Sequence, residues 1–373
     1  MISASVIIIQ GFIMSNFDLA NLALKSICPS NELLYDDKGL PSVMVKIPKM
    51  TYAQLGLGES DAVHPAFIVN GTEVDAIYIS KYQNVLHENR AYSLPGRDPR
   101  ASITFDNASN ACTSKGRGWH LMTRAEWALL ALWCKNNGTQ PKGNNDYGKD
   151  VSESNYIAIP TTFDGDGNIN HVATGTGPVT WSHDGTLSGI WDLNGNVYEW
   201  VGGLRTVYGE IQVLANNNAA DSNNSQAASS TMWKAIKASD GSLITPQGDG
   251  RTPGSVKASW STNKWTLTAN DPAEDTTYHG CLLESVECDN TIGDAAKLLL
   301  QALGIFKYDA TAGAYNGDYV YMDVTQAERS FFCGGGWNNG SSAGVFCLSG
   351  GHARSISGTS IGFRSAYVDL PAE

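Results

Sequence analysis

The chain has 373 residues, 42% of them hydrophobic, and carries 25 basic against 37 acidic side chains, a net charge of −12. This length allows a sizeable core, either in one domain with a large insertion or in two domains. The acidic balance and the lack of any Lys/Arg-rich run argue against nucleic acid as a partner, and they favour solubility and assembly.

Residues 1–40 are expected to form a lead-in or attachment segment ahead of the main domain. Residues 1–10 have no basic start and are too short to span a bilayer, so we expect neither export nor membrane insertion. Because no export signal is expected, the protein is expected to fold in a cytoplasm. Residues 18–25 predict a short helix, which a polar turn follows.

The next part of the chain predicts strands and then two helices. Residues 43–48 and 76–82 are β-branched or aromatic runs that predict strands, and residues 64–70 are a weaker candidate. Apolar spacing predicts a helix over residues 103–112, capped by Thr104 or Asp106.

A second helix is expected to begin at a capping box. Thr123 is followed three residues later by Glu126, which we expect to be structural rather than catalytic. The helix should run to residue 134 and end at the Asn-Asn-Gly of residues 136–138.

Residues 206–327 are expected to be an insertion. Within it, residues 215–230 are polar and low in complexity and predict a mobile loop, whereas residues 294–303 predict a helix. Before the insertion, residues 164–169 read Asp-Gly-Asp-Gly-Asn-Ile, which is rich in oxygen ligands. This run lacks the sixth-position Gly and twelfth-position Glu of an EF-hand, so we expect a hairpin turn.

The residue types used in common active sites do not occur here in their usual spacings. Seven cysteines form no CxxC pair, so we expect reduced and mostly buried thiols. The seven histidines show no paired ligand spacing, and no nucleophile elbow, Walker loop or dinucleotide glycine fingerprint is present.

Several short sequence motifs, which we call words, occur in a fixed order along the chain. They include Leu-Met-Thr-Arg-Ala-Glu-Trp at residues 121–127 and Asp-Leu-Asn-Gly-Asn-Val-Tyr-Glu-Trp at 192–200. These words resemble the formylglycine-generating-enzyme (sulfatase-modifying factor) family over residues 43–205 and 328–368. The resemblance implies an α+β, C-type-lectin-like fold: a small twisted antiparallel sheet, two helices and much irregular structure. It places this domain at residues 41–373, with the insertion at about 206–327.

Residues 329–368 alternate words such as Gly-Gly-Gly-Trp and Ile-Gly-Phe-Arg with unpatterned small and polar residues. The alternation resembles the variable segment of proteins diversified by diversity-generating retroelements, as in phage tropism determinants. Randomising the adenines of an AAC codon yields Ser, Gly, His, Ile, Thr, Ala, Asp or Tyr, but never Lys, Glu, Trp or Met. The unchanged AAC codon encodes Asn, and the following residues are all Asn or members of this set: Asn338, Asn339, Ser349, Gly350, Gly351, His352, Ile356, Gly358, Thr359 and Ser360. An ordinary Gly/Ser-rich loop is the alternative.

With Trp337, these residues of the variable binding segment, about 330–368, are implied to form an exposed ligand-binding face. Such a surface suits a macromolecule better than an enclosed small molecule. The resemblance implies a phage receptor-binding (tropism) protein that recognises a host-cell surface protein or glycan. It would act in a virion tail, as a homo-oligomer or with an assembly partner; a bacterial cytoplasm or cell surface is the alternative location.

The family's oxidases hold copper with two cysteines, at the second and seventh positions after the tryptophan. Those positions are Asn339 and Gly344 here, and neither residue supplies the soft thiolate that copper(I) needs. We therefore expect no copper and no enzyme; a copper or non-heme metal oxidase is the alternative function. Cys333 and Cys347 are expected to be buried structural thiols. A carbohydrate-binding lectin is a third alternative, but the usual calcium-sugar motif is missing.

One structural metal site is implied by the resemblance. The family's Asn-x-x-Gly-Asn-x-x-Glu word wraps a calcium ion, and the matching residues here are Asp192, Gly195, Val197 and Glu199. Side-chain and backbone oxygens are the ligands that this hard cation prefers. The alternative is that Glu199 pairs with Arg205 or with backbone amides.

Overall fold

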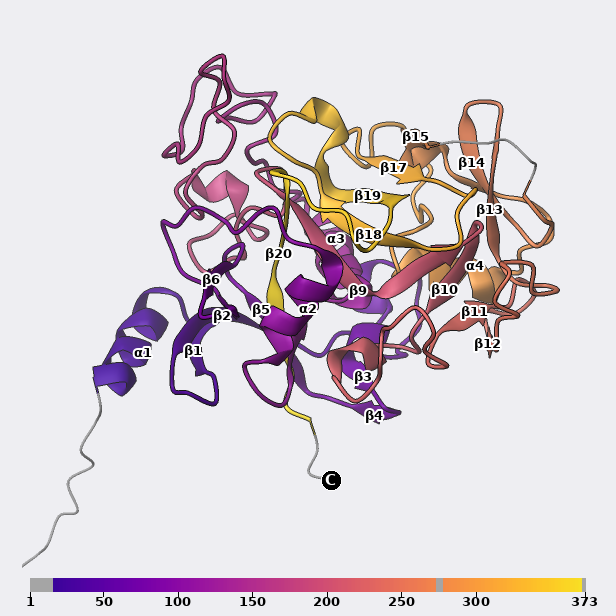
Figure 1. Ribbon diagram of the computed structural model, residues 1–373, viewed down its shortest axis with the longest axis horizontal. Coiled ribbons are helices and arrows are strands. Elements are labelled where there is room, and N and C mark those ends of the chain that lie inside the picture. Colours follow the sequence, from indigo (N-terminus) through magenta and orange to yellow (C-terminus); the bar gives the residue numbers. More distant parts are fainter. Residues whose placement is uncertain (1–15, 273–277, 371–373) are drawn as a thin grey trace, which may run out of the picture.

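The structure is a computed structural model that describes residues 16–272 and 278–370. Over these ranges the chain forms an α+β fold with two main sheets and four α-helices (Figure 1). Most of the lead-in predicted ahead of the first helix lies outside the described residues. None of the helices in the described ranges combines the length and the apolar character needed to cross a bilayer.

The first sheet is antiparallel, with the strand order β1-β2-β5-β21-β8. The strands are β1 (Asn31–Tyr35), β2 (Pro41–Pro48), β5 (Ala76–Ser80), β8 (Trp119–Leu121) and β21 (Ser365–Tyr367). The predicted strands at 43–48 and 76–82 correspond to β2 and β5. Residues 31–35 were assigned to the lead-in, but they pair with β2, so the sheet begins before residue 41.

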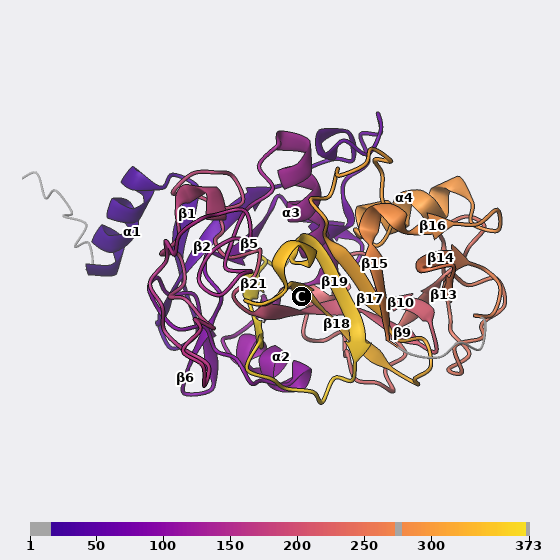
Figure 2. The ribbon, with the colours of Figure 1, turned by 90° about the horizontal axis from the view of Figure 1, so that it is seen from above.

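The second sheet has twelve strands and follows the order β15-β17-β19-β18-β9-β10-β13-β14-β16, with β11, β12 and β20 at its sides. The strands are β9 (Tyr198–Val207), β10 (Glu210–Val213), β11 (Lys234–Ile236), β12 (Leu243–Ile244), β13 (Lys257–Ser261), β14 (Lys264–Thr268), β15 (His279–Leu282), β16 (Glu287–Cys288), β17 (Tyr319–Met322), β18 (Arg329–Gly334), β19 (Gly344–His352) and β20 (Ile361–Phe363). The predicted insertion therefore extends this sheet on both sides: β10 pairs with β9, and β17 pairs with β19 (Figure 2).

The helices follow the sequence signals closely. They are α1 (Asn16–Ile27), α2 (Phe105–Thr113), α3 (Arg124–Asn137) and α4 (Asp294–Ala302). Thr104 caps α2, and the Thr123–Glu126 capping box begins α3. Gly138, in the left-handed region at φ 67°, ends α3, as the sequence predicts.

Helices α2 and α3 lie on opposite faces of the strands β9 and β18 (Figure 2). Successive side chains of a strand point to opposite faces, and here both faces are buried. Phe331 packs into the core that contains α3, whereas Phe332 packs into the core beneath α2. The apolar words on both sides of the variable residues are thus fixed by the core.

Three further predictions concern short elements and loops of the chain. Residues 64–70 form a 3-10 turn (Pro65–Phe67) and β3 (Ile68–Val69), which pairs with β4 (Thr72–Glu73); β6 (Val85–His87) pairs with β7 (Arg90–Tyr92). Residues 164–169 form the expected hairpin turn, closed by a bridge between Phe163 and Ile169. The predicted mobile loop at 215–230 is anchored at its start, because the buried Asn217 amide donates to Glu126 and to the Ala66 carbonyl.

Candidate ligand-binding surface

The variable segment consists of buried strands joined by two surface loops, residues 335–343 and 353–360. The strands β18, β19 and β20 bury the apolar members of the scaffold words, as the alternating pattern predicts. Both loops carry small and polar residues. Replacing an exposed residue on either loop therefore affects the surface more than the core.

The predicted face divides by exposure. Its exposed members are Asn338, Ile356 and Thr359. Its half-buried members are Asn339, Gly351, His352, Gly358 and Ser360. Its buried members are Trp337, Ser349 and Gly350. The expectation that every member is exposed is thus wrong for these three; their role in binding stays a prediction.

Ser349 and Gly350 are buried because β19 extends to residue 352 and lies between β17 and β18. A Cβ added to Gly350 would clash with the ring of Phe331, and one added to Gly351 would clash with Tyr278. The Ser349 hydroxyl lies 3.4 Å from the Tyr278 hydroxyl. The middle of the variable segment is therefore covered by aromatic rings.

His171 brings the two surface loops together. Its Nε2 is 2.9 Å from the carbonyl oxygen of Thr359, and its ring centroid is 5.0 Å from that of Trp337. Tyr198 N donates to the carbonyl of Ser360 on the same side. Tyr147 N donates to the carbonyl of Trp337, so the backbone of both loops is held by residues outside the variable segment. No sequence signal predicts this role for His171, which lies far from both loops in the chain.

A row of aromatic rings continues the face across the second sheet, and we call it the aromatic strip. Its members, in order along the row, are Tyr198, Phe332, His352, Tyr278, Tyr321 and Tyr319, with successive ring centroids 4.6–5.7 Å apart. Tyr278 is 45% exposed. The three tyrosines contributed by the insertion, Tyr278, Tyr319 and Tyr321, were not predicted from the sequence. The signal for two of them is the alternation Tyr319-Val-Tyr321, which places both rings on one face of a strand.

The aromatic strip is uncharged at neutral pH. Burial raises the pKa of the Tyr278 hydroxyl to about 12. Burial also lowers the pKa of His352, and the nearby Arg329 lowers it further. Phe332 is buried in the core. The other rings of the strip therefore offer apolar faces and hydroxyl groups rather than ionic contacts.

The oxidase copper site has no counterpart here. Asn339 Oδ1 accepts a hydrogen bond from Gly336 N at 2.8 Å. A Cβ at Gly344 would clash with the Asp318 carboxylate, so even a cysteine would not fit at that position. Burial raises the pKa of Cys333 to about 11 and that of Cys347 well above its usual value. Both thiols are buried, as predicted. In the described ranges no group of three or more His, Cys, Asp or Glu side chains could hold a metal.

The predicted calcium loop does bring oxygens together, but they surround an amide. Gln83 Nε2 lies 3.0–3.3 Å from the carbonyl oxygens of Asp192, Gly195 and Val197 and 3.1 Å from Glu199 Oε1. Glu199 also pairs with Arg364 rather than with Arg205.

Asp192 Oδ1 has no hydrogen-bond partner in the structure, but burial raises the pKa of this carboxyl to about 6. As arranged, these residues do not fit a calcium ion, because the amide nitrogen of Gln83 fills the point where their oxygens converge. Calcium at this loop stays a prediction from the resemblance, which a titration or thermal unfolding with and without calcium can test.

The profile of the sulfatase-modifying factor enzyme 1-like domain matches residues 7–242. The chain belongs to this family. Membership confirms the C-type-lectin-like fold of the formylglycine-generating-enzyme type that the sequence predicted. The variable segment lies beyond the matched residues. The comparison with curated proteins gives no match.

Three solved structures are loosely similar to this family member. PvdO from Pseudomonas aeruginosa is 14% identical with a TM-score of 0.31, over 90% of this chain and 97% of that one. Treponema denticola variable protein 1 is 11% identical with a TM-score of 0.31, over 91% and 100%. The P3c variant of the Major Tropism Determinant is 11% identical with a TM-score of 0.28, over 91% and 71%.

Proposed function

We propose that this protein is a diversified ligand-binding protein and not an enzyme. Its binding surface consists of the loops 335–343 and 353–360 together with the aromatic strip. The proposal rests on the pattern of burial in the variable segment. The apolar scaffold words are buried, whereas Asn338, Ile356 and Thr359 are exposed. All three exposed residues belong to the set that an adenine-randomised AAC codon can reach.

The chemistry of the surface supports recognition of a large target. Tyrosines supply rigid contact area with an apolar face and a hydroxyl, and their ordering costs little conformational entropy. None of the exposed variable residues Asn338, Ile356 and Thr359 is a Trp, Tyr or Arg, so each contributes little binding energy of its own. A fixed aromatic strip can then supply affinity while the variable residues decide which target fits.

The target we propose is a host-cell surface protein or glycan, bound by this chain as a receptor-binding protein of a phage tail. Modest affinity at one surface becomes strong binding when several copies act together. A homo-oligomer or an array in the virion would supply those copies. The alternative location, a bacterial cytoplasm or cell surface, would leave the binding surface itself unchanged.

A cell-binding assay tests the proposal. Fluorescently labelled protein is mixed with the host of the phage, and the triple variant Asn338→Ala/Ile356→Ala/Thr359→Ala should lose binding. The control Glu73→Ala/Asp75→Ala changes exposed residues near β4 and should bind normally. In the neighbouring DNA, a near-copy of the codons for residues 330–365 beside a reverse-transcriptase gene is expected. Equal binding by the triple variant together with the absence of such a copy would contradict the proposal.

A further inference from the structure

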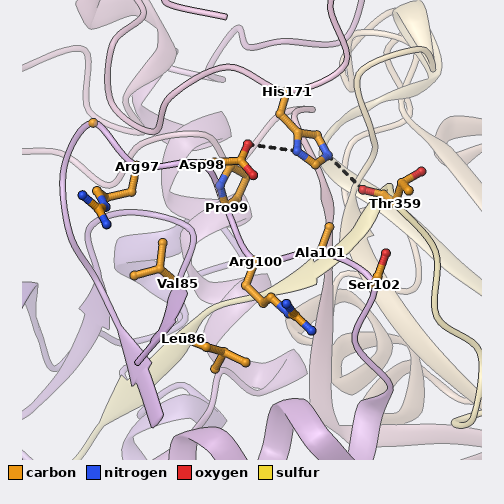
Figure 3. A pocket seen from close by; sticks show the side chains of 11 residues that line it. Val85, Leu86, Arg97, Asp98, Pro99, Arg100, Ala101, Ser102, His171 and Thr359 are labelled. Carbon is orange, nitrogen blue, oxygen red and sulfur yellow. Dashed lines mark hydrogen bonds and ion pairs between the residues drawn. The ribbon is translucent and has the colours of Figure 1, made fainter. Parts of the chain in front are cut away.

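A pocket with both polar and apolar lining residues opens beside the variable segment (Figure 3). Its volume is about 660 Å³, which falls within the range of small-molecule sites. Residues 96–102 form one wall and β6 contributes Val85 and Leu86. Thr359, an exposed variable residue, lies at its edge. The pocket thus joins fixed parts of the fold to a position that diversification can change.

Two arginines on the 96–102 wall lack partners. Arg97 and Arg100 are exposed, and neither side chain forms a hydrogen bond or an ion pair with any described residue. Every other arginine of the chain has such a partner: Arg90, Arg117, Arg124, Arg205, Arg251, Arg329, Arg354 and Arg364. The two unpaired guanidinium groups line the same pocket, although the chain as a whole carries a net charge of −12.

Asp98, the acidic residue of the pocket, already has hydrogen-bond partners within the protein. Asp98 accepts hydrogen bonds from His171 Nδ1 at 3.1 Å and from the Thr161 hydroxyl. Burial raises the pKa of Asp98, but these hydrogen bonds outweigh it and hold the pKa below its usual value. Figure 3 shows its carboxylate turned toward His171, while Arg97 and Arg100 leave the loop in other directions. The aspartate therefore fixes His171 and leaves both guanidinium groups for a ligand.

We propose that this pocket binds a carboxylate-bearing sugar, such as a uronic acid unit of an acidic glycan. This inference rests on the proposed function and names the chemistry of its target. A guanidinium group binds a carboxylate through two parallel hydrogen bonds. Val85 and Leu86 offer apolar contacts to the C–H face of a sugar ring, and the hydroxyl groups of Ser102 and Thr359 suit its hydroxyls. The concave shape favours one sugar unit over the flatter surface of a protein partner.

The arrangement separates a fixed contact from a variable one. The arginines lie outside the variable segment, so every diversified copy of the protein keeps them. The backbone of Thr359 is held by His171, so a new side chain at this position changes the rim of the pocket without moving the loop. The arginines bind the anion that all targets share, and residue 359 selects among the sugars that carry it.

The test is an NMR titration of the full chain with ¹⁵N-labelled arginine. The Nε–H signals of the two residues are assigned as those missing from Arg97→Lys and Arg100→Lys. Glucuronate should shift both signals, whereas glucose, its uncharged counterpart, should not. In calorimetry, Arg97→Ala/Arg100→Ala should weaken glucuronate binding at least tenfold. The control Arg251→Ala removes a surface arginine from an exposed ion pair and should bind normally.

Two outcomes would overturn the inference. One is that glucuronate leaves both signals in place, or that glucose shifts them equally. The other is that a pentaglutamate peptide binds more tightly than an oligouronate, which would assign the pocket to an acidic protein. If the double variant keeps host-cell binding that Asn338→Ala/Ile356→Ala/Thr359→Ala loses, the proposed function stands and only the pocket assignment fails. Glucuronate binding without any cell binding would mean that the pocket assignment stands and the proposed function fails.

Discussion

Arg364 and Glu199 form a fully buried ion pair, with Nε 2.9 Å from Oε2 and Nη2 2.8 Å from Oε1. Arg364 also donates to the backbone carbonyls of Ser80 and Trp191. Ser80 ends β5 of the first sheet, and Glu199 belongs to β9 of the second. One arginine side chain, from the Ile-Gly-Phe-Arg word, therefore joins the two sheets.

Arg364→Ala is expected to destabilise the protein by about 3–5 kcal/mol, because it leaves Glu199 as a buried charge without its ion-pair partner. Urea unfolding at pH 7 measures the loss. The matched control is Arg251→Ala, which removes an exposed pair with Asp271 and should cost only about 0–1 kcal/mol. Equal losses in the two variants would contradict a structural role for the buried pair.

Calcium is expected to leave the thermal unfolding of chelator-treated protein unchanged. A ligand that binds only the native state must stabilise it, and the Gln83 amide already fills the oxygen cluster. Gln83→Ala should cost about 1–3 kcal/mol, since the cluster loses its shared donor. A clear rise in the melting temperature of the wild-type protein at millimolar calcium would restore the calcium site that the sequence predicted.

The variable segment should tolerate change in its loops but not in the middle of β19. Replacing Asn338, Ile356 and Thr359 together should alter stability by about 0.5 kcal/mol per site, as is usual for exposed positions. Gly350→Val should instead cost about 1–3 kcal/mol, because its side chain would overlap the Phe331 ring. Thermal unfolding distinguishes the two; a cooperative transition lost in the triple variant would argue against a tolerant surface.

No copper-dependent cysteine oxidation is expected. Cys333 and Cys347 are buried thiols whose raised pKa values leave little thiolate to bind copper(I). The protein is incubated with copper(I) and a sulfatase-type cysteine peptide, which is then weighed by mass spectrometry. Aldehyde above the copper-only control, lost in Cys333→Ser or Cys347→Ser, would favour the oxidase alternative.

Asp318 should make stability depend on pH. Burial raises the pKa of this carboxyl well above its usual value, although Phe346 N donates to it at 2.7 Å. A carboxyl with a raised native pKa stabilises the fold when protonated, and this contribution is lost as the pH rises from its unfolded pKa toward its native one. Asp318→Asn should therefore gain stability relative to wild type between pH 4 and pH 7. Urea unfolding across this range measures the difference, and a constant difference would contradict the assignment.

Local signals predicted most of the helices. The capping box at Thr123 and Glu126, the Thr104 cap and the Gly138 end all depend on neighbours within a few residues, so the sequence displays them directly. The paired strands of the insertion escaped prediction because pairing depends on partners far away in the chain. β17, for example, lies beside β19 of the variable segment, and this contact carries Tyr319 and Tyr321 to the binding surface.

The candidate site was predicted only in part for the same reason. The resemblance and the codon set selected candidate variable residues but did not show how deeply they are buried. Nothing in the sequence Ser349-Gly350 shows that β19 continues to residue 352 and lies against Tyr278. The Gln83 amide that fills the calcium loop is more than one hundred residues away from it in sequence. The roles proposed for His171 and for the two unpaired arginines of the pocket likewise depend on tertiary structure, so they could not be predicted from the sequence.

The position of β21 has a consequence for synthesis. This strand is made after the last variable residue, Ser360, yet it lies in the interior of the first sheet, between β5 and β8. A ribosome that stops early or shifts frame within the variable codons releases a chain in which β5 and β8 keep open edges. Such edges expose unpaired backbone groups and promote aggregation. A chain must therefore be translated in frame through the codons of residues 330–364 before β5 and β8 can be joined by β21.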